Sequence, residues 1–335
     1  MALAELTQRT GFPKSSVMGI CHALTGENML ARGVDGTYWL GARVFELGSV
    51  ARVQSWTLHN IGFTYPLDES FFLAEIAALR AEANALEANL VVRSATEDKE
   101  RQSRQIREFV AARVDLILVE PVVSEGLEAA CAQAHRARIP VVAIGSAISG
   151  ADAVVATDNT KAGSLAGAAL VKALVGQGRV AVVGGIPITA NSDRVAGFLG
   201  AIAGHPRMTV VATSRGELDA PSGQRAAEEI LATHPDVEGF FASNDQIAIG
   251  ISRVLARRKL FVPIVAVDGA QGAVDQIRAG GPIVASATQD PVALVRTAIE
   301  IGSALQSGIG VVRQSHYIAP RLIDSQNAGD YQPWG

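Results

Sequence analysis

Polar side chains follow several apolar runs of this chain, and their chemical types suit the binding of a small polar molecule. The run 240–242 ends in Asn244 and Asp245, later runs end in Asp268 and Gln289, and Arg194 lies early in an expected helix. Amides donate and accept hydrogen bonds, carboxylates accept them, and a guanidinium donates in a fixed fork. Ligands bind at the carboxyl ends of strands in open α/β sheets. We therefore predict that Arg194, Asn244, Asp268 and Gln289 surround a binding cleft, with Asp245 capping the helix that follows.

A small molecule with hydroxyls on its rim and C–H bonds on its faces would match this set. Phe71 and Phe72, at the start of another expected helix, offer aromatic surface for such a face. Structural alternatives remain open for each residue: Asp268 could form a turn with Gly269, Arg194 could pair with Asp193, and both phenylalanines could belong to a core. Asp158 is interpreted mainly as a helix N-cap.

The chain contains no arrangement typical of catalysis, metal binding or cofactor binding. Its six histidines are scattered, and no nucleophile–base motif is present. Gly184-Gly185 lacks the glycine order of a dinucleotide site, so we expect no cofactor, no metal and no enzyme activity. The two cysteines, Cys21 and Cys131, are too few for a disulfide framework and are expected to be reduced and buried.

Composition indicates a protein of two or three domains without a membrane span. The 335 residues are 48% hydrophobic but only 5% aromatic, with 33 glycines and a net charge of -4. The chain begins without a basic segment followed by an apolar one, and no run of about 18 apolar residues occurs. These features favour a cytoplasmic location.

From residue 60 onward, apolar runs alternate regularly with helical patterns. The runs lie at 61–65, 89–93, 115–119, 140–144, 179–184, 208–212, 239–242, 263–267 and 283–287. Such alternation predicts an α/β fold with doubly wound parallel sheets. Two sheets are expected from the length, and a single nine-stranded sheet is the alternative.

The first 57 residues have a different pattern. Helices are expected over 2–10 and from Lys14 to Glu27, the second burying Val17, Ile20, Cys21 and Leu24, and Asp35-Gly36 indicates a hairpin. Helix, turn, helix and hairpin is the order of a winged helix-turn-helix. Residues 42–57 are predicted to form a linker helix, or else to cover this small domain.

Residues 2–50 resemble the DNA-binding domain of the IclR family of bacterial regulators. The resemblance rests on Leu3-Ala-Glu-Leu-Thr-Gln-Arg-Thr-Gly-Phe-Pro-Lys-Ser-Ser-Val17 and Asp35-Gly-Thr-Tyr-Trp-Leu-Gly41. It implies that Lys14, Ser15 and Ser16 begin a recognition helix that contacts double-stranded DNA. Met18-Gly19 replaces the family's polar pair, and the family's first helix has no counterpart here. The apolar face that this helix would cover is then covered by the linker helix, or else the natural protein is longer, which is the reading that we favour.

Residues 59–327 resemble the superfamily of ribose-binding proteins and the lactose repressor. The resemblance is carried by 70–72, 115–121, 139–143, 157–159, 194–198, 234–245, 267–269 and 287–291. It implies two Rossmann-like lobes, 59–157 plus 290–318 and 158–289 plus 319–327, followed by a tail over 328–335. It also implies that Phe71, Phe72, Arg194, Asn244, Asp268 and Gln289 contact a sugar.

The site departs from the ribose pattern at three places. Gly145-Ser146 stands where ribose binders have an acid and an arginine, Leu218 replaces an aromatic residue, and Glu69 replaces an amide. Another pentose, a hexose or a polyol is therefore left open as the ligand.

Together these features predict a cytoplasmic, sugar-responsive transcription regulator. A small carbohydrate or polyol effector would close the lobes and change how a homodimer binds two-fold operator DNA. The alternative is the solute-binding component of a sugar ABC transporter.

Overall fold

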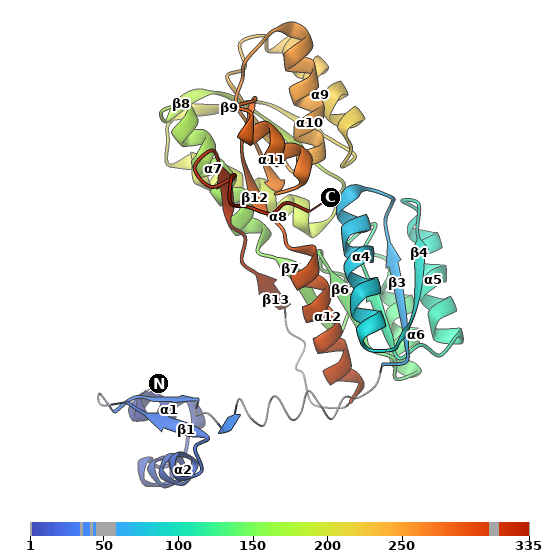
Figure 1. Ribbon diagram of the computed structural model, residues 1–335, viewed down its shortest axis with the longest axis vertical. Coiled ribbons are helices and arrows are strands. Elements are labelled where there is room, and N and C mark those ends of the chain that lie inside the picture. Colours follow the sequence, from blue (N-terminus) through green and yellow to red (C-terminus); the bar gives the residue numbers. More distant parts are fainter. Residues whose placement is uncertain (1, 34–35, 41–42, 45–57, 308–314, 335) are drawn as a thin grey trace. The chain divides into compact units, whose positions relative to one another are not determined.

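The computed structural model describes residues 2–33, 36–40, 43–44, 58–307 and 315–334. The chain divides into two units, Met1–Trp56 and Thr57–Gly335 (Figure 1). The predicted linker over 42–57 lies outside the described residues except for Arg43 and Val44.

The N-terminal unit contains two helices and a hairpin. Its elements are α1 (Leu3–Thr10), α2 (Lys14–Gly26), β1 (Leu30–Arg32) and β2 (Tyr38–Leu40). The strands pair antiparallel, which confirms the predicted hairpin. Val17, Cys21 and Tyr38 form its buried core. The prediction that Ile20 is buried was wrong: it lies at the edge of the buried stripe of α2 and is 50% exposed.

The second unit contains two six-stranded sheets, one in each lobe. The sheet of lobe one has the order β13-β7-β6-β5-β3-β4, with every pair parallel. Its strands are β3 (Asn60–Tyr65), β4 (Asn89–Ser94), β5 (Leu116–Val119), β6 (Val141–Ile144), β7 (Ala153–Thr157) and β13 (Ser315–Ile318). The central strands are apolar along their whole length, as expected for a parallel sheet with both faces covered.

Helices cover both faces of this sheet (Figure 1). One face packs against α4 (Ser70–Ala85) and α12 (Pro291–Gln306). The other packs against α5 (Lys99–Ala111) and α6 (Glu128–Arg136), and it buries Cys131 as a free thiol, as predicted.

Lobe two repeats this architecture with the strand order β14-β12-β11-β10-β8-β9. Its strands are β8 (Gln177–Gly184), β9 (Arg207–Arg215), β10 (Gly239–Ala242), β11 (Ile264–Asp268), β12 (Ile283–Thr288) and β14 (Leu322–Asp324). All pairs are parallel except β12 and β14. The chain therefore passes between the lobes after β7, after β12 and after β13.

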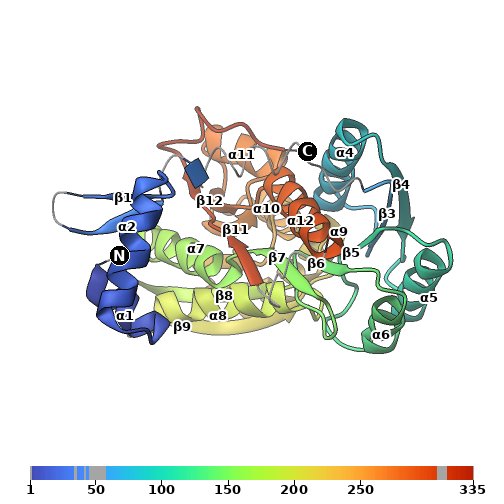
Figure 2. The same ribbon diagram turned by 90° about the horizontal axis from the view of Figure 1, so that it is seen from below.

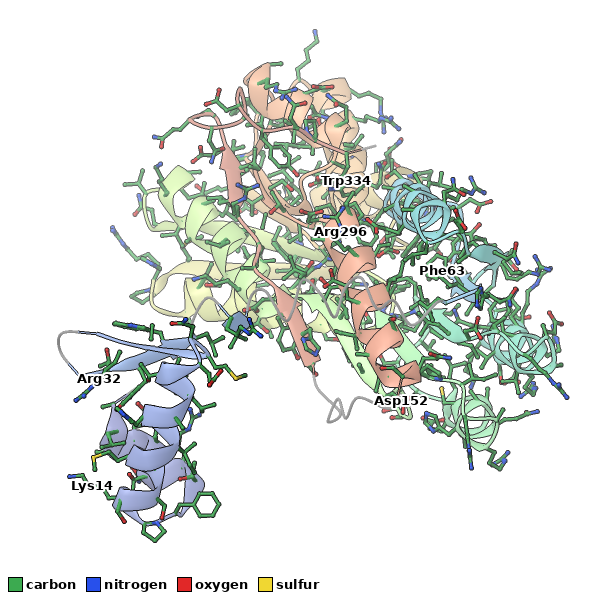
Figure 3. All side chains as sticks on the ribbon, turned by 60° about the horizontal axis from the view of Figure 1, so that its bottom comes forward. Lys14, Arg32, Phe63, Asp152, Arg296 and Trp334 are labelled. Carbon is green, nitrogen blue, oxygen red and sulfur yellow. The ribbon has the colours of Figure 1, made fainter. Side chains whose placement is uncertain are left out.

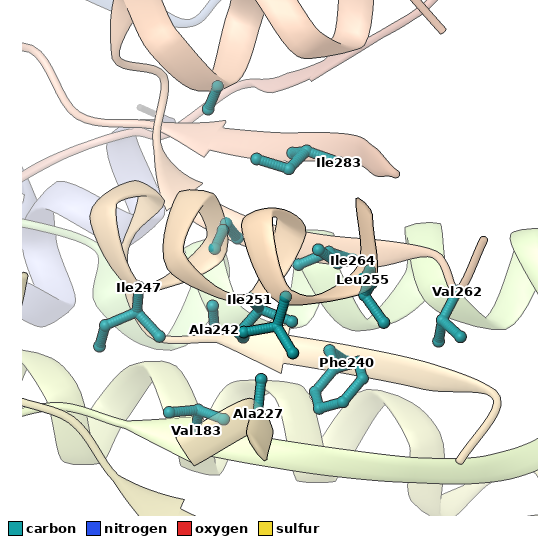
Figure 4. Close-up of a cluster of buried hydrophobic side chains, with 14 of the residues drawn as sticks. Val183, Ala227, Phe240, Ala242, Ile247, Ile251, Leu255, Val262, Ile264 and Ile283 are labelled. Atoms are coloured by element: carbon teal, nitrogen blue, oxygen red, sulfur yellow. The ribbon is translucent and has the colours of Figure 1, made fainter. Parts of the chain in front are cut away.

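One face of the second sheet carries α7 (Asn159–Ala173) and α8 (Thr189–Ala203), which run side by side (Figure 2). The other face carries α9 (Ala220–Thr233), α10 (Asp245–Arg258) and α11 (Gln271–Arg278). Phe240 of β10 packs there with Ile247, Ile251 and Leu255 of α10 (Figure 4). The predicted sequence of buried strand, polar end and amphipathic helix is confirmed.

Each of the nine apolar runs forms a strand, but in two sheets, so the single-sheet alternative was wrong. The strand β7 was not among the nine runs, because it follows β6 through a turn over 145–152 with no helix between them.

Candidate functional site

All six residues predicted to contact a ligand line one cavity between the lobes. Phe71 and Phe72 come from the start of α4 in lobe one. The lobe-two contributors are Arg194 on α8 and three residues at strand ends, Asn244, Asp268 and Gln289. Each of the six is at most 6% exposed. The cavity has an open volume of about 30 Å³, which holds a water molecule but not a sugar.

Arg194 is held at the centre of this cavity by three acceptors. Its Nε donates to Asn159 Oδ1 at 2.8 Å, and its Nη1 donates to the Ser243 carbonyl at 2.7 Å and to Asp268 Oδ1 at 3.2 Å. The predicted alternative, pairing with Asp193, is not what the structure shows. A methyl group at Gly163 would lie 1.9 Å from the Arg194 carbonyl oxygen, so glycine permits the close approach of α7 and α8 that fixes this residue.

Asp268 links three parts of lobe two. Its Oδ1 also accepts from Gln289 Nε2 at 2.8 Å, and its Oδ2 accepts from the Asp245 N–H at 3.4 Å. Burial raises the pKa of this carboxyl, and the Arg194 guanidinium opposes that shift. The Asp268 backbone has φ of 142°, a region that non-glycine residues rarely adopt and that is typical of functional sites.

The predicted role of Asp245 as a helix cap was wrong. Asn244 caps α10 instead, because its Oδ1 accepts from the Ile247 N–H at 2.9 Å while its Nδ2 donates to the Leu218 carbonyl at 2.9 Å. The Asp245 carboxylate faces the sheet, where it accepts from Ser286 Oγ and the Ala270 N–H, each at 2.7 Å. Burial and the neighbouring Asp268 raise its pKa well above the ordinary value.

The Asp158 side chain accepts a hydrogen bond from the Lys161 N–H, so Asp158 is the helix N-cap that the sequence predicted.

The two phenylalanines belong both to the cavity wall and to the core of lobe one. Their rings meet edge to face, with centroids 5.7 Å apart. Trp334, which Figure 3 labels, lies in the segment predicted as a tail. Its ring packs edge to face on that of Phe71, with centroids 5.3 Å apart. Its indole N–H lies 3.2 Å from the Asp268 carbonyl and 3.1 Å from that of Gln289. Sequence reasoning missed this residue, because no regular pattern connects it to the strand ends.

Two buried acids were also missed. Glu120 lines the cavity directly after β5, where the strand-end rule used for Asp268 would have found it. Glu75 lies on the buried face of α4 beside Phe72, Ile76 and Leu79. An acidic residue within the apolar stripe of a helix was the sequence feature that could have identified it. Glu69, Gly145 and Leu218, the positions where the sequence departs from the ribose pattern, also line the cavity.

Hydroxyl groups of lobe one cap the N-terminus of α8, which belongs to lobe two. The residue before the helix is Ile188, which offers no side-chain oxygen to cap it. The Thr189 N–H donates to Ser124 Oγ at 3.0 Å, and the Ala190 N–H donates to Ser146 Oγ at 3.4 Å. Lobe-one hydroxyls therefore satisfy lobe-two backbone donors, which couples the two lobes.

Lys14, Ser15 and Ser16 are exposed in the first turn of α2, and Figure 3 shows the Lys14 side chain on that helix. Within the described residues, no group of three or more His, Cys, Asp or Glu side chains is placed to hold a metal ion. No helix of the described part of the chain is long and apolar enough to cross a membrane.

Comparison with known proteins identifies the second unit. Residues 61–309 match the periplasmic binding protein domain family. The ribose import binding protein of Haemophilus influenzae is 30% identical over 228 residues, which cover 67% of this chain and 77% of that protein. The D-apiose import binding protein of Paraburkholderia graminis is 29% identical, over 78% of this chain and 86% of that protein.

A solved structure of a solute-binding protein is also similar to this chain. An ABC transporter solute-binding protein from Mycobacterium smegmatis with bound glycerol superposes with a TM-score of 0.78. It is 29% identical, and the match covers 83% of this chain and 99% of that one.

These relatives correct several predictions made from the sequence. They are import or solute-binding proteins, so the predicted transcription regulator, its operator DNA partner and its cytoplasmic location were wrong. Without a DNA partner, the predicted contact of Lys14, Ser15 and Ser16 with DNA has no support. The homodimer was predicted because it would bind two-fold operator DNA, so that prediction has no support either. The family match does not include the N-terminal unit, and an IclR-type domain is not shown. The two-lobed α/β fold and the absence of enzyme activity are confirmed. The chain belongs to the periplasmic binding protein domain family and is a binding protein rather than an enzyme.

Proposed function

We propose that this chain is the solute-binding component of a sugar ABC transporter and holds a small carbohydrate or polyol between its lobes. The observation that carries this proposal is the meeting of Phe71, Phe72, Arg194, Asn244, Asp268 and Gln289 around one interlobe cavity. The relatives support it, because the names of two assign them to the import of ribose and D-apiose, and the name of a third assigns it to the binding of galactofuranose. Such a protein captures its solute outside the cytoplasmic membrane, and that is where we place this chain.

Each residue has a distinct role in the proposed site. A carboxylate has about four lone-pair positions, and Asp268 uses three of them within the protein, so it can accept a further bond from a ligand hydroxyl. Arg194 and Gln289 keep that carboxylate in place. Phe71 and Phe72 supply apolar surface for the C–H face of a sugar ring.

Ligand entry requires the lobes to separate, since the cavity of about 30 Å³ is too small for a sugar. The contacts that would open include those of α8 with Ser124 and Ser146, and the bond from Gln246 Nε2 to Ser70 Oγ at 3.2 Å. Bound sugar would add contacts to both lobes and so favour the closed arrangement.

We further propose the lobe boundaries 59–157 plus 290–318 and 158–289 plus 319–327, which the strand composition of the two sheets supports. For the first unit we propose a winged helix-turn-helix fold, supported by the order α1, α2, β1 and β2. This second proposal concerns the fold of the unit and assigns it no nucleic-acid partner.

The test is a thermal-shift and calorimetry screen with ribose, apiose, arabinose, galactose and myo-inositol. A ligand at 100 times its Kd should stabilise the protein by about 2.7 kcal/mol. Replacing Asp268 by Asn should weaken binding by roughly tenfold or more, because a charge-assisted hydrogen bond is lost. Asp275→Asn is the matched control, since Asp275 pairs with Arg278 on the surface. If no carbohydrate or polyol binds, or if both variants bind as the wild type does, the proposal is wrong.

A further inference from the structure

Two carboxyl groups in and behind the cavity wall have oxygen atoms without partners. Glu75 is fully buried, and neither of its carboxyl oxygens has a hydrogen-bond partner. Glu120 is 2% exposed, lines the cavity, and has an unpartnered Oε2. An unsatisfied buried carboxyl is costly in a folded protein, so such a pair requires a physical explanation.

The position of Glu120 is fixed by its surroundings. Its N–H donates to the Thr64 carbonyl at 2.9 Å, and its carbonyl accepts from Gln102 Nε2 at 2.8 Å. Its carboxyl occupies space that a side chain at Gly145 would need, since a methyl group there would lie 2.4 Å from Oε1. The end of β5 and the glycine at the end of β6 therefore direct this acid into the cavity.

The cavity wall has more acids than bases. Glu69, Glu120 and Asp268 line it, whereas Arg194 is its single base among the described residues. Arg194 donates one hydrogen bond to Asp268, and its other hydrogen bonds go to the Asn159 side chain and the Ser243 carbonyl.

Burial disfavours the ionised form of both acids. Burial raises the pKa of Glu75 well above the ordinary value. Burial does the same to the pKa of Glu120, with the Glu75 carboxyl adding to the rise and Arg194 opposing it. The two carboxyls are therefore close enough to interact electrostatically.

This inference deepens the proposed function and rests on it. We propose that the ligand is a polyhydroxylated molecule with a basic nitrogen, an amino sugar or amino cyclitol. Its ammonium group donates to Glu120, and Glu75 supplies a second negative charge behind that contact. The remaining hydroxyls bind Asp268 and its neighbours.

An ammonium group fits this pair better than a hydroxyl does. A hydroxyl brings no charge, so with a neutral ligand bound the two buried acids stay in the protonated form and make no charge-assisted hydrogen bond. An ammonium group donates up to three bonds and carries the opposite charge. Its arrival favours the ionised form of both acids, so protons should leave the protein when the ligand binds.

The experiment compares matched pairs of probes: D-galactose with D-galactosamine, D-glucose with D-glucosamine, and scyllo-inositol with scyllo-inosamine. Calorimetry in two buffers that differ in ionisation enthalpy measures both the affinity and the protons released. In at least one pair, the amine should bind roughly tenfold or more tightly than its neutral partner and should release protons.

Three variants assign the effect to its residues. Glu120→Gln and Glu75→Leu should each remove most of the preference for the amine, and thermal melts without ligand show whether they fold. Glu228→Gln is the matched control. Glu228 lies on α9, away from the strand ends that form the cavity, and forms an exposed ion pair with Arg257. This variant should keep the preference for the amine.

Two results would overturn the inference, and they are distinguishable. Binding of the neutral members as tightly as the amines, in pairs that bind at all, contradicts the basic nitrogen and leaves the proposed function standing. Failure of every neutral and amino probe, together with the wider sugar screen, counts against the proposed function and against this inference with it.

Discussion

At the scale of single residues, the unusual feature of this protein is a fully buried acid on the core face of α4. Glu75 makes no hydrogen bond through its carboxyl oxygens, and burial raises its pKa well above the ordinary value of 4.5. A carboxyl whose pKa is raised in the folded state stabilises the protein below its unfolded pKa, and this contribution is lost as the pH rises through the folded pKa. Glu75 therefore costs stability at neutral pH.

Replacing Glu75 by Leu should raise the free energy of unfolding of the protein without ligand at pH 8. The gain should be of the order of 1–3 kcal/mol, the cost of an unsatisfied buried group. It should shrink as the pH falls through about 4.5, because below that pH the wild-type carboxyl is protonated in the unfolded state as well as in the folded one. Denaturant unfolding across this pH range measures the difference. Glu228→Leu, at an exposed position, serves as the control, and a Glu75→Leu gain that does not change with pH would contradict the argument.

At the scale of elements, α8 combines two tasks. The glycine contacts with α7 fix Arg194, because a methyl group at Gly197 would lie 2.0 Å from the Thr160 carbonyl oxygen. Its first backbone N–H groups bond to Ser124 and Ser146 of the other lobe. The same helix thus positions a predicted ligand contact and depends on lobe closure for its caps.

Removing both serine hydroxyls should therefore favour separation of the lobes. Each cap is worth about 1 kcal/mol, so Ser124→Ala with Ser146→Ala should lower the population of the closed form. Small-angle X-ray scattering should then give a larger radius of gyration for the double variant without ligand. Ser222→Ala is the comparison, since its hydroxyl bonds to Glu217 and Asp219 within lobe two. Equal radii for the double variant and the wild type would show that these caps do not hold the lobes.

At the scale of the whole molecule, the chain consists of two units with separate cores. Val17, Cys21 and Tyr38 form the core of the first unit, whereas each lobe of the second has extensive clusters of its own. The cavity residues all belong to the second unit.

Deleting residues 1–57 should accordingly leave a folded protein whose affinity for its carbohydrate ligand is unchanged. Circular dichroism tests the fold, and calorimetry with the best probe of the screen tests the binding. The full-length chain measured in parallel is the reference. Aggregation of the shortened protein, or a clear loss of affinity, would show that the first unit contributes to the site or to the stability of the lobes.

The sequence alone determined the parts of this protein that depend on short windows of chain. The nine predicted strands and the strand-end positions of Asn244, Asp268 and Gln289 follow from local hydrophobic patterns, because burial of a strand and a helix face has a fixed period. The same local reasoning found the helices and hairpin of the first unit. It misjudged the function, because the resemblance of about 50 residues was taken to decide the role of the whole chain.

Only the tertiary structure decided which distant residues meet. Glu75 and Glu120 lie on different elements, and Trp334 reaches the ends of β11 and β12 from the last residues of the chain. The helix α8 receives its caps from another lobe, and Asp245 turns to Ser286 rather than to its own helix. These contacts join residues far apart in sequence, and their partners are set by how sheets and helices pack, which no local pattern specifies.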